Sequence, residues 1–83
     1  MKIFKLSQSQ NEGWDTFDSL IVVADSEEEA RLIHPAEEYE IEIDWGEPYS
    51  SWCSSPNDVK VEYLGEAKEG TKKGIILTSY NAG

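Results

Sequence analysis

The sequence predicts an α+β fold: a four- or five-stranded, mainly antiparallel sheet with one short helix on a face. Two observations predict this class. Five short runs show the alternation or the density of β-branched residues that is typical of strands, whereas only one position carries a strong helix-start signal. A chain of 83 residues has the size of one domain, so we expect a single domain over 1–83.

The first two strands are expected near the amino terminus. Residues 2–7 alternate in hydropathy, and residues 17–24 include the dense apolar run Leu-Ile-Val-Val, which favours a central strand. A polar loop separates the two runs and contains Gly13 as its turn residue. These strands are therefore predicted to form an antiparallel pair.

The helix is expected to begin at Ser26. The run Ser-Glu-Glu-Glu has the form of a capping box, in which the Ser26 hydroxyl accepts from the Glu29 amide and the Glu29 carboxylate returns to the Ser26 amide. The apolar pattern continues through Ile33, and Pro35 disfavours helical geometry at His34. A helix of about two turns follows from these limits.

Three further strands are expected in the second half of the chain. Residues 39–44 alternate without error and predict an edge strand, and residues 59–64 and 75–79 predict two more. Residues 45–58 are rich in turn-forming residues and predict a long loop. The glycine-containing stretch 65–74 predicts a connection of hairpin type between the last two strands.

The negative charge of the chain is concentrated in one segment. The formal net charge is −10, and residues 25–47 contain ten acidic residues and one base, Arg31. The rest of the chain is nearly neutral. This distribution argues against nucleic acid or an anionic membrane as a direct partner, because both are polyanions.

An acidic surface of this kind can bind a basic site on another protein. Such a surface speeds association with an oppositely charged groove. The alternative is a solvated face, or an acidic edge strand that prevents aggregation. The candidate protein-binding residues are Glu27, Glu28, Glu37, Glu38, Glu40, Glu42, Asp44 and Glu47.

The aromatic residues offer a second kind of candidate site. Trp45, Tyr49, Trp52 and Tyr80 have ring faces on which a nucleotide base could stack. The predicted helix begins with three glutamates and the chain has no phosphate-binding loop, which opposes nucleotide binding. The alternative is that these rings fill a small core or a subunit interface.

The residue pattern opposes catalysis. His34 with Cys53 or a loop serine is the only pairing of a base with a nucleophile, and neither position has the context of an activated site. A core of this size rarely spares the volume of a catalytic cleft. Metal-ligand spacings are also missing, although Asp15 and Asp18 could hold a cation weakly. We therefore expect no enzyme activity, metal site or cofactor.

The chain has the composition of a soluble, cytoplasmic protein. Its single Cys53 cannot form an intramolecular disulfide, which fits a reducing compartment. No stretch has the length of a signal-peptide core or of a membrane span.

Three segments carry a resemblance. Residues 15–35 contain Asp-Thr-Phe-Asp-Ser, Ser-Glu-Glu-Glu-Ala-Arg and Ile-His-Pro, residues 52–67 contain Val-Lys-Val and Leu-Gly-Glu-Ala, and residues 74–83 end in Thr-Ser-Tyr-Asn-Ala-Gly. In these motifs the chain resembles a family of short phage and bacterial proteins. The resemblance implies a phage or mobile-element origin, which would place the protein in the host cytoplasm, and it carries no assigned active site.

Three functions remain open at this point. We expect first a non-enzymatic accessory protein whose acidic surface engages a basic site on a host protein, as a mimic of nucleic acid or an inhibitor of a defence factor. The second is an oligomeric protein that sequesters a small ligand such as a nucleotide. The third is a structural or assembly component of a phage particle.

Overall fold

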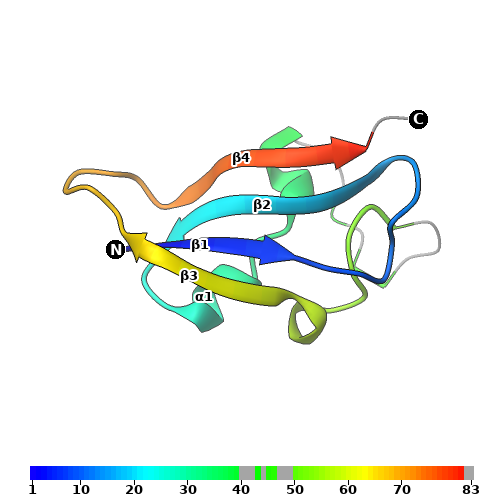
Figure 1. The fold of residues 1–83 in the computed structure, drawn as a ribbon, viewed down its shortest axis with the longest axis horizontal. Coiled ribbons are helices and arrows are strands. Elements are labelled where there is room, and N and C mark those ends of the chain that lie inside the picture. Colours follow the sequence, from blue (N-terminus) through cyan, green and yellow to red (C-terminus); the bar gives the residue numbers. More distant parts are fainter. Residues whose placement is uncertain (40–42, 44, 47–49, 82–83) are drawn as a thin grey trace.

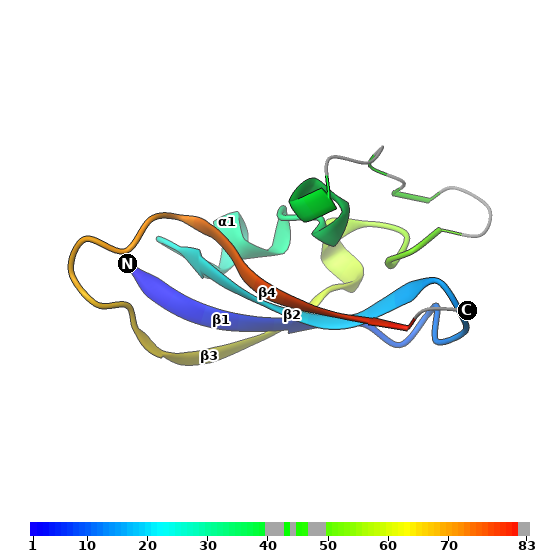
Figure 2. The same cartoon turned by 90° about the horizontal axis from the view of Figure 1, so that it is seen from above.

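A computed structural model describes residues 1–39, 43, 45–46 and 50–81 of the chain. These residues form a four-stranded antiparallel sheet with one α-helix and two short 3-10 helices over one face (Figures 1 and 2). The predicted α+β class is thereby confirmed. In chain order the elements are β1 (Lys2–Ser7), β2 (Thr16–Ala24), α1 (Glu27–Arg31), η1 (Pro35–Tyr39), η2 (Pro56–Asp58), β3 (Lys60–Glu66) and β4 (Gly74–Asn81).

The strand order is β3-β1-β2-β4, so β2 is central, as its dense apolar run predicts. Antiparallel pairing of β1 with β2 is also confirmed, with Phe4 opposite Val22 and Leu6 opposite Leu20. Residues directly opposite each other share a face of the sheet. These four side chains are all buried, and they form the inner face on which the helices pack.

The hairpin predicted over 65–74 is wrong. The strands β3 and β4 lie at opposite edges of the sheet, and the connection 67–73 passes the ends of both central strands (Figure 1). The Ala67 amide donates to the Met1 carbonyl at 2.9 Å along this path. A short connection favours pairing between consecutive strands. In this sheet, however, β1 and β2 pair with each other, β3 pairs with the other edge of β1, and β4 pairs with the other edge of β2.

The helix α1 begins where the capping box predicts. The Ser26 hydroxyl accepts from the Glu29 amide at 3.2 Å, and Ser26 itself has extended backbone angles, as an N-cap requires. The helix ends at Arg31, two residues before the predicted end at Ile33. Ala30 is its buried residue and packs into the core.

The Ser26 cap gives a direct test of this local interpretation. We expect Ser26→Ala to lower the free energy of unfolding by about 1 kcal/mol, because the Glu29 amide loses its acceptor. Ser26→Asp restores an acceptor and should recover most of this loss. Urea unfolding followed by circular dichroism measures both, and equal losses in the two variants would contradict the capping role.

The strand predicted over 39–44 is not supported by the residues that the structure describes. Tyr39 ends the 3-10 helix η1, and Ile43 belongs to no strand, while residues 40–42 and 44 lie outside the described part. Proline at the first position of η1 has a φ that suits a helical turn. The Glu37 carboxylate accepts from the His34 amide at 2.8 Å and stabilises the start of this turn.

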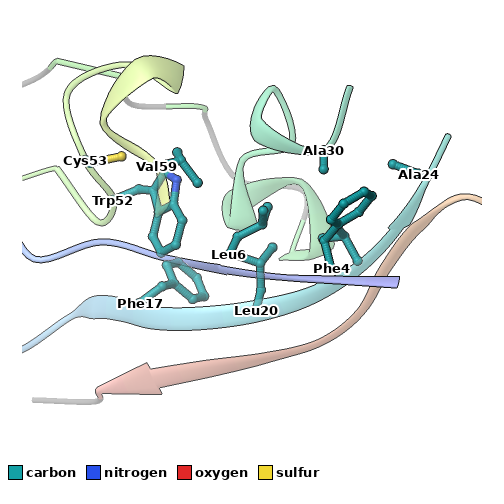
Figure 3. Packing of buried hydrophobic residues seen from close by; sticks show 10 residues of the cluster. Phe4, Leu6, Phe17, Leu20, Ala24, Ala30, Trp52, Cys53 and Val59 are labelled. Atoms are coloured by element: carbon teal, nitrogen blue, oxygen red, sulfur yellow. The ribbon is translucent and has the colours of Figure 1, made fainter. Parts of the chain in front are cut away.

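The core lies between the sheet and the segments above it (Figure 3). Trp52, from the loop predicted over 45–58, is fully buried and directs its ring toward Phe17 of β2. The β1–β2 loop holds this segment, because the Asn11 side-chain Nδ2 donates to the Trp52 carbonyl. The Phe17 amide also donates to the Ser51 carbonyl at 2.8 Å. A long loop thus supplies the largest side chain of the core.

Candidate functional site

The described carboxylates of the acidic segment lie on the helical side of the sheet. We call this set the acidic layer. Both α1 and η1 cover the same face of the sheet, so their glutamates form part of one side of the molecule (Figure 2). The members of the acidic layer are Asp25, Glu27, Glu28, Glu29, Glu37 and Glu38.

Half of the predicted protein-binding residues belong to this layer. The exposed residues Glu27 and Glu28 form the first turn of α1, and the exposed residues Glu37 and Glu38 lie in η1. The other four predicted residues lie outside the described part of the chain: Glu40, Glu42, Asp44 and Glu47. The described structure therefore places the glutamates of α1 and those of η1 on the same side of the sheet.

Among the described residues, Arg31 and Lys73 form ion pairs with carboxylates of the acidic layer. Arg31 Nη2 lies 2.9 Å from the Glu27 carboxylate, one helical turn away. Its Nη1 donates to the Pro56 carbonyl at 3.3 Å, which ties α1 to η2. Lys73 Nζ lies 2.6 Å from the Asp25 carboxylate and 3.3 Å from that of Glu29.

Sequence reasoning missed the role of Lys73. Lys73 belongs to the nearly neutral remainder of the chain, yet the connection 67–73 brings it against the acidic layer. Contact with Lys73, first through the hydrogen bond, lowers the pKa of Asp25 below its usual value. The same hydrogen bond raises the pKa of Lys73. No local pattern marks this pairing, because it depends on the path of the chain across the sheet.

These shifts predict a pH-dependent contribution to stability. Since the pKa of Asp25 is lower in the folded state, its contribution is present above the usual value of 3.8 and is lost as pH falls through the folded-state pKa. The contribution of Lys73 is present below its usual value of 10.5 and is lost as pH rises through its raised pKa.

We expect Lys73→Met to lower the midpoint of thermal unfolding at pH 7, and we expect this difference to vanish at pH 2. Lys72→Met makes the same change of charge next to the ion pair and is the matched control. Equal shifts for the two variants at pH 7 would show that net charge, and not the contact with Asp25 and Glu29, determines the effect.

The described aromatic candidates lie in different surroundings. Trp52 is fully buried in the core, so it presents no open ring face. Trp45 is half-buried and packs edge-on against His34, with ring centroids 4.9 Å apart. Tyr80 packs on Phe17 at a centroid distance of 4.8 Å. Tyr49 lies outside the described residues. Of the described candidates, Trp52 alone is fully buried, whereas Tyr80 is exposed at 46% of its surface.

Cys53 and His34, the residues considered for catalysis, are buried and contact backbone groups of the chain. Cys53 is fully buried, and its thiol lies 3.5 Å from the Ser55 carbonyl. Burial raises the pKa of this thiol, which opposes formation of the reactive thiolate. His34 is also buried, and its Nδ1 accepts from the backbone amide of Ala36 at 3.0 Å.

Asp15 and Asp18 accept hydrogen bonds from side chains at the end of β4. Asp18 accepts from the Asn81 side chain at 2.6 Å, and Asp15 accepts from the Tyr80 hydroxyl at 3.2 Å. The described residues contain no group of three or more His, Cys, Asp or Glu side chains arranged to hold a metal ion. Within the same residues, no helix has the length and apolar character needed to cross a membrane.

A small open hollow adjoins the acidic layer. It has a volume of about 170 Å³ and lies between η1 and the start of β4. Its lining includes the two exposed glutamates of η1 and the apolar side chains of Ile33 and Ile75. The combination gives this side of the molecule a shallow, negatively charged depression.

Comparison of the chain with protein-family models, curated proteins and solved structures finds no match.

Proposed function

We propose that this protein is a non-enzymatic acidic binding module whose acidic layer occupies a basic site on another protein. The single observation that supports this most is the placement of α1 and η1 on one face of the sheet. Among the described residues this placement gathers six carboxylates, of which three pair with Arg31 or Lys73. The resemblance to phage proteins suggests a host protein as the partner, and a nucleic-acid-binding groove is a basic concave surface that such a layer could fill.

Glu28 and Glu38 are the carboxylates best placed for this role. Both are exposed, and among the described residues neither pairs with a cation. Glu28 lies on α1 and Glu38 lies on η1, so a variant that changes both alters the two helices that carry the acidic layer. Exposed carboxylates without a cation partner are accessible to a binding protein and steer its approach at low ionic strength.

A pair of double variants tests the proposal. Glu28→Lys/Glu38→Lys reverses two charges of the acidic layer, whereas Glu62→Lys/Glu69→Lys makes the same change of net charge elsewhere. Glu62 lies opposite Lys5 on the other face of the sheet, and Glu69 belongs to the connection before β4. Circular dichroism confirms that each variant retains the fold.

Both variants and the wild-type protein are immobilised, and bacterial proteins that they retain are identified by mass spectrometry. We expect the wild-type protein and the Glu62/Glu69 variant to retain a common basic protein, and the Glu28/Glu38 variant to lose it. Retention by all three, or equal loss from both variants, would contradict a binding role for the acidic layer.

A further inference from the structure

The two edge strands of the sheet differ in charge. The edge strand β3 carries Lys60, Glu62 and Glu66, and charged side chains of this kind oppose pairing with another strand. The edge strand β4 has the sequence Gly-Ile-Ile-Leu-Thr-Ser-Tyr-Asn and no charged residue over its eight positions. Both edge pairings contain register shifts, so bulges do not distinguish the two edges. In a chain of net charge −10, the uncharged edge is the exception.

The outer side of β4 is accessible in the described structure. Figure 2 looks onto this edge, and no described helix or strand lies across it. Ile76, Leu77 and Tyr80 are exposed at 49%, 56% and 46% of their surfaces. The 3-10 helix η1 touches β4 on its inner face, where the Tyr39 hydroxyl lies 2.7 Å from Thr78 Oγ1. The backbone groups on the open side of β4 thus lack a strand partner among the described residues.

We propose that β4 pairs in an antiparallel manner with β4 of a second copy of this chain, about a two-fold axis. The pairing would join the two sheets into one continuous sheet with β3 at both outer edges. Antiparallel pairing of a strand with its own copy is self-complementary, as a two-fold interface requires. The exposed apolar side chains of β4 would be covered by their counterparts.

Charge complementarity supports a second copy as the partner. The connection that precedes β4 contains Lys68, Lys72 and one acid, Glu69, together with Lys73, which pairs with Asp25 and Glu29 of its own chain. The opposite end of β4 is flanked by Asp15 and Asp18, which bond its last residues, and the segment 8–19 contains no Lys or Arg. An antiparallel two-fold pairing sets Lys68 and Lys72 of each copy at the same end of the interface as Asp15 and Asp18 of the other. This favourable arrangement occurs twice in the dimer.

The two-fold axis of such a pairing is perpendicular to the sheet, so both acidic layers lie on the same side of the joined sheet. The dimer therefore extends the acidic surface without covering it. The dimerisation inference does not depend on the proposed function, because its test uses the purified chain alone.

Sedimentation equilibrium over about 10 µM to about 1 mM protein tests the inference. We expect the wild-type protein to approach twice its monomer mass of 9.4 kDa as concentration rises. Leu77→Lys places like charges near the axis and should weaken dimerisation at least tenfold, because like charges on facing strands destabilise pairing. Leu64→Lys makes the same substitution on β3 and should leave the dimer unchanged. A wild-type protein that remains monomeric at the highest concentration would overturn the inference, as would loss of the dimer in Leu64→Lys alone.

Cysteine cross-linking gives a second measurement that does not rely on a charged variant. Single substitutions Leu77→Cys, Thr78→Cys and Ser79→Cys lie near the centre of β4, while the native Cys53 is fully buried. Mild oxidation should give a disulfide-linked dimer for at least one of them, and Leu64→Cys should give none. Cross-linking that is absent at all three positions, or equal at Leu64→Cys, would overturn antiparallel pairing of β4.

Discussion

Trp52→Ala is expected to lower the free energy of unfolding by about 3 to 5 kcal/mol. The Trp52 side chain is fully buried, and it is the largest of the fully buried side chains. Its removal takes apolar contacts from Phe17 and leaves a cavity that the surrounding strands cannot fill completely. Domains of this size have total stabilities of about 5 to 15 kcal/mol, so the variant should be largely destabilised near room temperature. Urea unfolding followed by far-UV circular dichroism measures the loss.

Trp14→Ala is the matched control for this substitution. The Trp14 side chain lies in the β1–β2 loop and is exposed at 77% of its surface. Removal of an exposed ring should change the free energy of unfolding by about 0.5 kcal/mol or less. If the two tryptophan variants lost similar stability, the placement of Trp52 in the core would be incorrect.

Leu6→Ala has the second largest expected effect, a loss of about 2 to 5 kcal/mol. Leu6 is fully buried on the inner face of β1, opposite Leu20 on β2 and Val61 on β3. Because it contacts the strands on both sides, its truncation removes packing from three strands at once. Thermal unfolding of the variant should show a large fall in the midpoint temperature, of several degrees for each kcal/mol.

The control for Leu6 is Leu64→Ala on the neighbouring strand. Leu64 is exposed at 48% of its surface, at the register shift between β1 and β3. We expect its truncation to cost less than half as much as that of Leu6, because half of its surface already faces water. A loss from Leu64→Ala equal to that from Leu6→Ala would show that the inner and outer faces of the sheet have been assigned incorrectly.

Features that depend on local sequence could be predicted. Alternation and β-branched density located β1, β2, β3 and β4 within a few residues, because these signals arise from neighbours along the chain. The Ser26 cap could be predicted for the same reason, since all of its atoms lie within four residues. Placement of Glu27 and Glu28 in the first turn of the helix followed from the same cap, whereas no local signal predicted the 3-10 helix that carries Glu37 and Glu38.

Features that depend on the path of the chain could not be predicted. The alternation at 39–44 favours a strand, but Tyr39 belongs to a 3-10 helix whose start is set by Pro35 and by the Glu37 carboxylate. The separation of β3 from β4 depends on which edges β1 and β2 leave open. Lys73 reaches Asp25 only because of that crossing. Tertiary contacts of this kind leave no periodic signal in the sequence.

Displacement of DNA from the captured partner tests the central claim most directly. A fluorescent DNA duplex is bound to the purified basic protein, and the wild-type chain is added while fluorescence anisotropy is followed. If the acidic layer occupies the nucleic-acid-binding groove, the wild-type chain should release the DNA, with a strong dependence on salt, and Glu28→Lys/Glu38→Lys should not. DNA that remains bound when the partner is saturated with the wild-type chain would contradict the claim that the acidic layer fills that groove.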